Sequence, residues 1–191
     1  TVTKRSGSLD ILVNNAGIRP TRRVLEMSAV EWEKVLAVNL SGTFYCCRAT
    51  APFMVERKWG RIINLSSMAA QQGSTGGHSH YAAAKAGIVG FSRSLARELA
   101  PSGITVNVVS PGWIDTEGWD GQLEGHREEY AAKVPVGRLG TPERESSVRQ
   151  LVGRVVGAMA RWGREGGYFA DEGAAQAFEW ELAHLLVNQM A

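Results

Sequence analysis

The chain has 191 residues, of which 44% are hydrophobic and 21% are charged, and its formal net charge at pH 7 is +2. This composition is typical of one globular domain that is long enough to bury a core. The small charge argues against nucleic acid or an anionic membrane surface as a partner, and no apolar run approaches the roughly 18 residues that a membrane-spanning helix needs.

The first predicted strand is the apolar run at residues 11–13. Ser28 and Glu31 then form the pattern of a capping box, in which each side chain can bond a backbone amide at the start of a helix. Four apolar residues follow at four-residue spacing, as on one face of a long amphipathic helix: Trp32, Leu36, Leu40 and Phe44. Cys46 and Cys47 are adjacent on this helix and point in different directions, so we expect no disulfide and a reduced, cytoplasmic setting.

The second predicted strand covers residues 61–65 and ends at Ser66 and Ser67. A helix is expected over residues 80–100, because its periodic pattern stops at Pro101. The helix is rich in small residues, which permit close packing of another element: Ala82, Ala83, Ala84, Ala86, Gly87 and Gly90.

The third predicted strand covers residues 104–109. Pro142 stands where the first turn of a further helix would begin. An apolar stripe follows it at helical spacing: Val148, Leu151, Val152, Val155, Val156 and Met159. Residues 178–186 have the pattern of one more amphipathic helix.

Apolar strands that alternate with helices predict right-handed βαβ units on a parallel sheet that helices cover on both faces. The predicted fold class is therefore α/β, a doubly wound sheet in three layers, α/β/α. Such sheets bind ligands at the carboxyl ends of their strands. These ends carry residues 15–17 (Asn-Ala-Gly), 66–67 (Ser-Ser) and 111–112 (Pro-Gly), so we expect the three segments to face one crevice.

The candidates for chemistry lie near these strand ends. Tyr81 and Lys85 are four residues apart and share a helix face, where an ammonium favours the phenolate that a general base needs. The alternative is a surface tyrosine stacked on a lysine stem. Ser67 can reach the same crevice, although most hydroxyls at strand ends serve the local turn. Asn39 has apolar neighbours and needs partners for its amide; it either bonds its own backbone or holds a water in the site.

Two other patterns are weaker candidates. His78 and His80 could contribute to a zinc site, but no third ligand is close in the sequence, so no metal is expected. The Gly-rich loop at residues 73–77 lacks the lysine and the strand–loop–helix setting of a phosphate-binding loop. We interpret it as a flexible loop on the substrate side.

The motifs and their order resemble the short-chain dehydrogenase/reductase family, and within it the branch similar to 3-oxoacyl-(acyl carrier protein) reductase. The matching stretches are residues 12–17 (LVNNAG), 38–40 (VNL), 60–67 (GRIINLSS), 81–87 (YAAAKAG), 104–116 (ITVNVVSPGWIDT) and 136–143 (VGRLGTPE). The resemblance implies a Rossmann-like fold. It also implies hydride transfer between NAD or NADP and a carbonyl or secondary alcohol.

The resemblance implies a role for each matching residue. Tyr81 is the general acid–base at the substrate oxygen, and Lys85 favours its phenolate and bonds the nicotinamide ribose. Ser67, rather than its neighbour Ser66, orients and polarises the carbonyl. Asn39 anchors a water that links Lys85 to bulk solvent. The cofactor-binding residues are expected to be Asn15, Ala16, Gly17, Tyr81, Lys85, Pro111, Gly112, Ile114 and Thr116.

The chain departs from the family pattern at both ends. The glycine-rich dinucleotide fingerprint is absent, and so is the residue that selects NAD or NADP, so we expect the first βαβ units to be missing and leave both cofactors open. The match fades from about residue 145, and residues 166–173 only partly resemble the family's final turn. We therefore interpret residues 1–191 as a single, N-terminally truncated Rossmann-like domain with a divergent C-terminal segment.

The function expected from the resemblance is NAD(P)-dependent reduction of a ketone, of 3-oxoacyl or another type, or oxidation of a secondary alcohol. The partner is then a small-molecule carbonyl or alcohol, and the helix at residues 80–100 is a candidate homo-oligomer contact. Trp113, Trp119 and Tyr130 suggest an apolar or ring-bearing ligand, or else ordinary packing. The alternative is a catalytically incompetent family member that acts as a binding or oligomerisation fragment. A third hypothesis is a nucleotide- or acyl-chain-binding protein of unrelated chemistry.

Overall fold

A computed structural model of the chain describes residues 8–74, 76–115 and 125–141. The chain divides into two compact units, residues 1–111 and 112–191, and each is described by itself. The elements of the first unit are β1 (Ile11–Asn14), η1 (Val24–Glu26), α2 (Ala29–Leu36), η2 (Ala37–Ser41), α3 (Gly42–Glu56), β2 (Gly60–Leu65), α4 (Ala69–Gln72), α5 (Ser79–Leu99), η3 (Ala100–Ser102) and β3 (Ile104–Val109). The second unit contains α6 (Arg127–Ala132).

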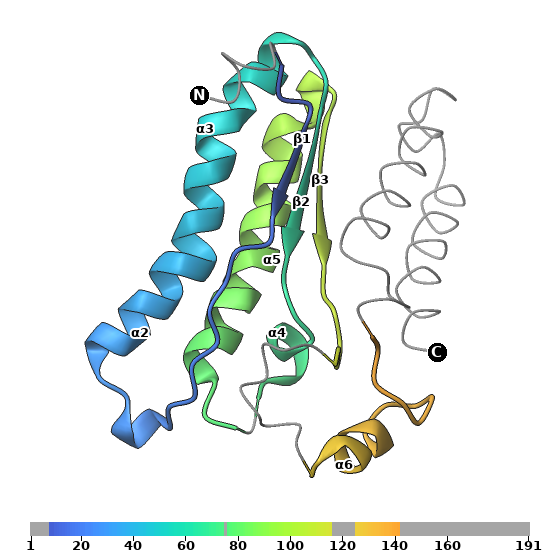
Figure 1. Cartoon of the computed structure of the whole chain (residues 1–191). Coiled ribbons are helices and arrows are strands. Elements are labelled where there is room, and N and C mark those ends of the chain that lie inside the picture. Colours follow the sequence, from blue (N-terminus) through green and yellow to red (C-terminus); the bar gives the residue numbers. More distant parts are fainter. Residues whose placement is uncertain (1–7, 75, 116–124, 142–191) are drawn as a thin grey trace. The chain divides into compact units, whose positions relative to one another are not determined.

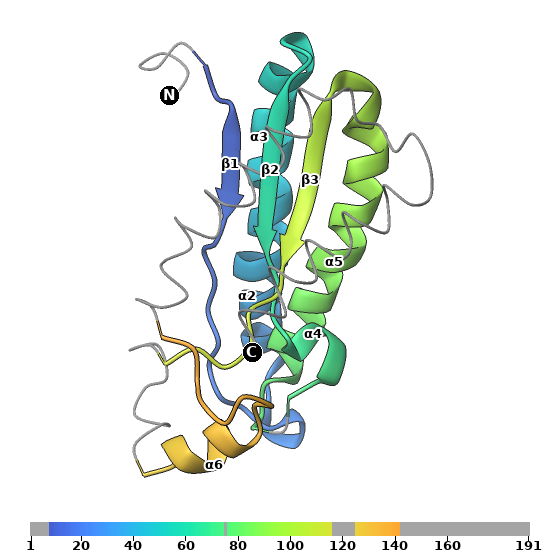
Figure 2. The same ribbon diagram turned by 90° about the vertical axis from the view of Figure 1, so that its right-hand side faces the viewer.

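Three parallel strands form the sheet of the first unit, in the order β1–β2–β3. The predicted strands at residues 11–13, 61–65 and 104–109 are confirmed to within one residue at each end. All six residues of β2, the central strand, are buried. Because the strands run in the same direction, their carboxyl ends lie at one edge of the sheet (Figure 2). The predicted candidate site lies at this edge.

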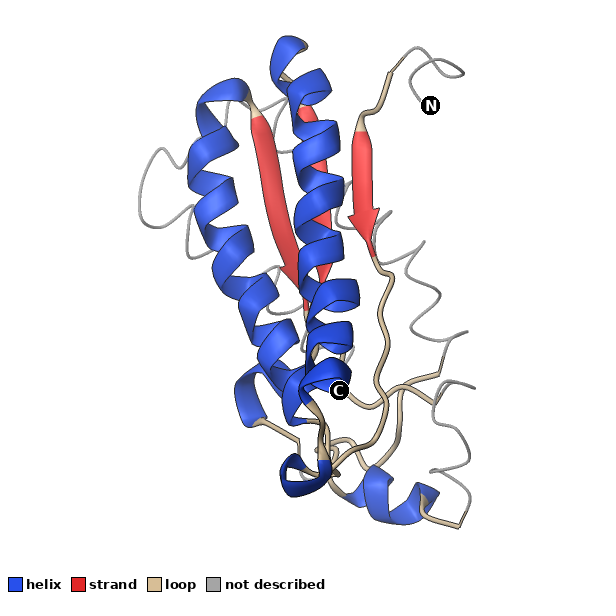
Figure 3. Cartoon of the chain, turned by 90° about the vertical axis from the view of Figure 1, so that its left-hand side faces the viewer, coloured by secondary structure: helices blue, strands red, loops and turns tan. Residues whose placement is uncertain are grey.

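The helices α3 and α5 lie side by side on one face of the sheet (Figures 1 and 3). The core between them and the sheet contains Cys47, Met54, Ile62 and Ile104. A parallel sheet covered by helices confirms the α/β class and is consistent with part of a Rossmann-like fold. The second helical layer and the missing first βαβ units stay predictions.

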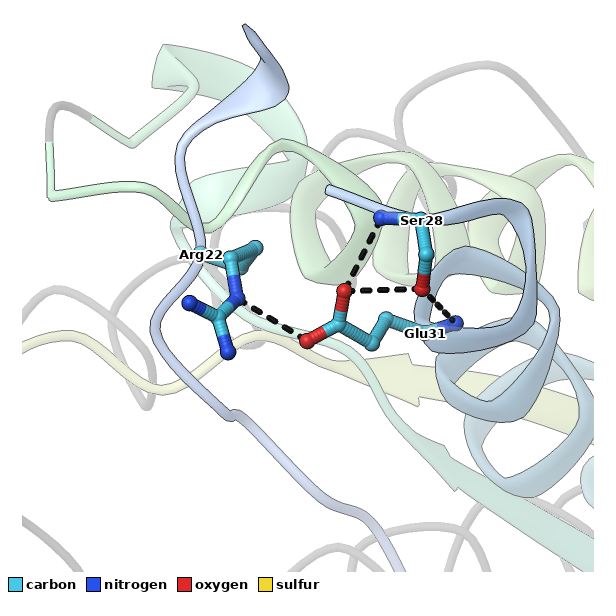
Figure 4. Close-up of polar contacts among 3 residues, drawn as sticks. All are labelled: Arg22, Ser28 and Glu31. Carbon is cyan, nitrogen blue, oxygen red and sulfur yellow. Dashed lines mark hydrogen bonds and ion pairs between the residues drawn. The ribbon is translucent and has the colours of Figure 1, made fainter. Parts of the chain in front are cut away.

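The capping box at Ser28 is confirmed. The Glu31 amide donates to Ser28 Oγ at 3.2 Å, and the Ser28 amide donates to Glu31 Oε2 at 2.9 Å (Figure 4). From here α2, η2 and α3 continue one another without a break from Ala29 to Glu56. Cys46 is exposed, Cys47 is buried, and both are free thiols, as predicted.

The buried face of this long helix is offset from the predicted apolar stripe. Trp32 and Phe44, the first and last residues of that stripe, are exposed. The buried side chains of this helix are Val35, Asn39, Thr43, Cys47 and Met54. The polar members of this set are tolerated because they bond helix carbonyls: Asn39 Nδ2 donates to Val35 at 2.9 Å, and Thr43 Oγ1 donates to the Asn39 carbonyl at 2.8 Å.

The helix predicted over residues 80–100 is α5, Ser79–Leu99, and the 3₁₀ turn η3 that follows it contains Pro101. Its small residues have two different settings. A Cβ at Gly87 would lie 2.8 Å from Leu40 Cδ2, so this glycine permits close packing, whereas a Cβ at Gly90 would meet nothing within 4 Å. None of the helices in the described part of the chain is both long and apolar enough to cross a membrane.

In the second unit, α6 was not expected from the sequence. Ile114 forms a parallel bridge with Gly140, and the rings of Trp113 and Tyr130 lie 4.7 Å apart between centroids. The predicted helices at residues 142–159 and 178–186, the turn at residues 166–173 and Trp119 lie outside the described residues.

Candidate active site

Lys85 is a buried cation at the carboxyl end of the central strand. Its Nζ donates a hydrogen bond of 2.6 Å to the carbonyl oxygen of Leu65, the last residue of β2. Burial lowers the pKa of Lys85 to about 8, because a low-dielectric surrounding disfavours the charged form. A lysine with this pKa can exchange protons close to neutral pH.

Tyr81 lies one helical turn before Lys85, as the sequence predicts. The lysine Nζ lies 5.6 Å from the centroid of the tyrosine ring, which is within the range of a cation–π contact. Tyr81 is only partly buried. The pair therefore places a buried cation and a partly buried phenol on one helix face.

The two serines after β2 have different bonds. Ser66 is buried, and its hydroxyl donates to the backbone carbonyl of Lys85 at 2.8 Å. Ser67 is partly exposed, and its hydroxyl oxygen accepts from the Ala69 amide at 3.2 Å. The Ser66 hydrogen is used to tie β2 to α5, whereas the Ser67 hydrogen is still available to a substrate oxygen. This difference favours Ser67 over Ser66 for the predicted role.

Asn39 lies in an unusual turn of helix. Residues Ala37–Ser41 form a π-helical turn, and such turns are frequent at functional sites. The Asn39 amide nitrogen donates to the carbonyls of Val35, at 2.9 Å, and Ile18, at 3.0 Å. Its oxygen Oδ1 is buried and has no hydrogen-bond partner in the described part of the structure. The amide thus bonds the backbone, as one alternative predicted, and keeps an acceptor free, as the other requires.

Gly17 brings Asn39 and Lys85 into one site. A Cβ at Gly17 would lie 2.6 Å from Asn39 Oδ1 and 3.7 Å from Lys85 Nζ. No other residue type fits here without displacing Asn39, since real Cβ contacts are almost never so short. Asn15, Ala16 and Gly17 are exposed, so their backbone is accessible at the end of β1.

The remaining predicted cofactor residues are placed less completely. The Pro111 carbonyl accepts from the Met68 amide at 3.0 Å, which holds the end of β3 beside the residues after β2. Gly112 and Ile114 belong to the second unit, and Thr116 lies outside the described residues. The structure therefore brings together the residues at the ends of β1, β2 and β3 with α5, and it leaves the roles of Gly112, Ile114 and Thr116 as predictions.

The histidines form no metal site with their described neighbours. Within residues 8–74, 76–115 and 125–141, no group of three or more histidine, cysteine, aspartate or glutamate side chains could hold a metal ion. His80 is buried, and its Nδ1 accepts from the Tyr81 amide at 3.0 Å. His78 is buried in a different set of contacts, with Arg19, Thr21 and Ser74, which no sequence pattern predicts.

A family model described as enoyl-(acyl carrier protein) reductase matches residues 1–149. The chain belongs to the short-chain dehydrogenase/reductase family. A second family model, described as class II vitamin B12-dependent ribonucleotide reductase, matches residues 111–189. It covers less than half of the chain and overlaps the first match, so it assigns no family.

Curated relatives agree with the first match. The chain is 44% identical over 140 residues to the 3-oxoacyl-(acyl-carrier-protein) reductase of Aquifex aeolicus, which is 73% of this chain and 56% of that protein. It is 46% identical over 134 residues to the enzyme of the same name from Escherichia coli, and the match covers 70% of this chain and 54% of that protein. Nodulation protein G of Azospirillum brasilense is 44% identical over 137 residues, and the match covers 72% of this chain and 55% of that protein. The chain spans about half the length of these relatives.

The buried ammonium of this short-chain dehydrogenase/reductase predicts how its stability varies with pH. Below pH 8 Lys85 is charged in the folded and the unfolded chain, and folding bears the full cost of its desolvation. Between pH 8 and 10.5 the unfolded chain still holds a proton that the folded chain has released, so the free energy of unfolding rises with pH. Lys85→Met lacks this rise. The difference in the free energy of unfolding between wild type and Lys85→Met therefore changes over this pH range by up to about 3 kcal/mol in favour of the wild type.

Urea unfolding of both proteins from about pH 7 to 10.5 measures this difference. Lys34 is an exposed lysine on α2, so Lys34→Met is the matched control. Its free energy of unfolding should differ from that of the wild type by a constant amount over the same pH range. Parallel curves for wild type and Lys85→Met would show that the Lys85 ammonium is solvated, which contradicts the site described above.

Proposed function

We propose that this chain carries the acid–base part of an NAD(P)-dependent oxidoreductase site, which reduces a ketone or oxidises a secondary alcohol. The observation that carries the proposal is the arrangement around Lys85. A buried ammonium with a lowered pKa lies beside a partly exposed phenol at the carboxyl edge of a parallel sheet, which is where such folds bind ligands. Membership of the family supports the same chemistry.

The residues present fit the nicotinamide side of a cofactor. Asn15, Ala16 and Gly17 offer exposed backbone at the end of β1, and the absence of a side chain at Gly17 lets this backbone approach Asn39 and Lys85 closely. Lys85 Nζ, 3.7 Å from the Cβ position of Gly17, would bond the ribose hydroxyls. NAD or NADP supplies a hydride when bound. That Pro111, Gly112, Ile114 and Thr116 also meet the nicotinamide stays an expectation from the family resemblance.

Tyr81 has the proposed role of proton donor to a ketone oxygen, or acceptor from an alcohol. The ammonium of Lys85 lies 5.6 Å from the centroid of its ring. The free hydrogen of the Ser67 hydroxyl would bond the same substrate oxygen and polarise the carbonyl. The Tyr81 proton is restored from solvent by way of Lys85, whose pKa of about 8 suits proton exchange at neutral pH.

Asn39 has the proposed role of holding a water between Lys85 and solvent. A buried carbonyl oxygen without a partner costs about 1 to 3 kcal/mol, and a bound water is the usual remedy where other polar groups are near. Asn39 Oδ1 and Lys85 Nζ both lie within 3.7 Å of the Cβ position of Gly17, so one water could bond both.

The substrate class is proposed from the relatives. Those from Aquifex aeolicus and Escherichia coli are named as reductases of 3-oxoacyl groups on acyl carrier protein, so a 3-oxoacyl thioester is the first substrate to test.

The test of this function is NADPH- or NADH-dependent reduction of a short 3-oxoacyl thioester by the full chain. Tyr81→Phe should lower kcat by about 10²- to 10⁴-fold, because the phenol is the proton donor. Tyr45 lies on α3 with 60% of its surface exposed, so Tyr45→Phe is the matched control and should keep wild-type activity. Saturable cofactor binding with equal turnover in wild type and Tyr81→Phe would contradict the proposal.

The alternative function is a binding or oligomerisation fragment, and one feature favours a self-associating surface. Phe44 and Phe53 are exposed apolar side chains on α3, and Phe44 packs edge-on against Phe91 of α5. On α5 the exposed residues Ala83, Ala86 and Gly90 follow one another along the helix. Apolar side chains beside a flat helix face suit packing against a second copy. We propose a homo-oligomer through α5 in either case.

Ala86→Arg places a long charged side chain on this face and should convert the oligomer to a monomer in sedimentation velocity. Val30 is an exposed residue of α2, so Val30→Arg adds the same charge elsewhere and should leave the oligomer intact. A wild-type chain that is monomeric at about 100 μM, where weak dimers form, would contradict an oligomer through α5. No saturable NADPH or NADH binding at millimolar concentration would favour the fragment over the enzyme.

A further inference from the structure

The imidazole of His78 joins two segments that are far apart in the sequence. Its Nε2 lies 3.1 Å from Thr21 Oγ1 and 3.4 Å from Arg19 Nη1, and its Nδ1 lies 3.1 Å from Ser74 Oγ. The side chain is buried, with 4% of the residue exposed. A histidine with three polar neighbours and almost no contact with water is a structural junction rather than a surface residue.

The chemistry of the neighbours fixes which nitrogen donates. An arginine can only donate, so His78 Nε2 must accept, and Nδ1 then carries the hydrogen and donates to Ser74 Oγ. This arrangement needs a neutral ring. Burial, together with the charge of Arg19 and the neighbouring His80, lowers the pKa of His78 to about 4, so the ring is neutral at pH 7.

Backbone contacts extend the same junction. The Arg22 amide donates to the Gly77 carbonyl at 2.8 Å. Gly77 has a φ of +79°, and a Cβ there would lie 3.1 Å from the Arg22 carbonyl carbon, so glycine is required. Arg22 Nε in turn donates to Glu31 Oε1 at 2.9 Å, and Glu31 closes the capping box of α2 (Figure 4). The junction is thereby anchored to the start of a long helix.

The two joined segments lead directly to opposite sides of the candidate site. Arg19 and Thr21 follow Gly17, where the cofactor is proposed to lie, whereas His78 precedes α5 and is three residues before Tyr81. The spacing between Gly17 and Tyr81 therefore depends on what holds these segments together. The His78 contacts and the Arg22–Gly77 backbone bond link the two segments directly, and Asn39 donates to the Ile18 carbonyl from η2.

We propose that His78 is a positioning residue that holds the segment after Gly17 against the residues before Tyr81, and so sets the distance between the cofactor side and the acid–base side of the site. The expected effect of His78 on cofactor binding rests on the proposed function. The junction itself stands on the contacts alone. His78 acts through Gly17 and Tyr81 and does not take part in proton transfer.

The test compares His78→Phe with His78→Gln in the full chain. Phenylalanine keeps an apolar ring but forms none of the three bonds, whereas the glutamine amide can accept from Arg19 or Thr21 and also donate. In His78→Phe, amide hydrogen exchange at residues 18–22 and 76–78 should rise about tenfold or more, since the segments lose their shared bonds, while β2 and β3 keep their protection. His78→Gln should restore most of the protection.

A second readout is the dissociation constant for NADPH, followed by fluorescence. It should rise about tenfold in His78→Phe and return close to the wild-type value in His78→Gln. His126 is an exposed histidine of the second unit, so His126→Phe is the matched control and should change neither readout. The same amide hydrogen exchange and the same NADPH affinity in His78→Phe and His78→Gln would overturn the proposal. The hydrogen bonds of His78 would then have no effect beyond the packing of its side chain. Absence of NADPH binding by the wild type would instead refute the proposed function, and the exchange result would still decide the junction.

Discussion

The ammonium of Lys85 donates to the carbonyl of Leu65 in a place that water barely reaches. This bond joins α5 to the carboxyl end of the central strand, and it fixes where the cation lies relative to Tyr81 and Gly17. The Ser66 hydroxyl adds a second link between the same elements, through the backbone carbonyl of Lys85. The candidate site thus depends on how tightly one helix is held against the end of one strand.

The local parts of this arrangement could be predicted from the sequence. The strand runs, the capping box at Ser28 and the shared face of Tyr81 and Lys85 each depend on residues a few positions apart, and short-range patterns report them. The α/β class followed from the alternation of these elements, and the comparison with known proteins confirmed the family that the motifs indicated.

The parts that were missed depend on contacts between distant residues. Lys85 is paired with Leu65, 20 positions earlier, and His78 with Thr21, 57 positions earlier, and no periodicity marks either pair. The buried face of α2 and α3 could not be predicted from an apolar pattern, because Asn39 and Thr43 occupy it by bonding helix carbonyls. These exceptions to local pattern gather around the candidate site, where function and stability make different demands.

The pKa of the Lys85 side chain, measured by NMR on the chain with labelled lysine, tests the account most directly. We expect a pKa of about 8 and a change in the Lys85 signals when NADPH is added. A value near 10.5, as in a solvated lysine, together with signals that NADPH leaves unchanged, would contradict both the buried ammonium and its place in a cofactor site.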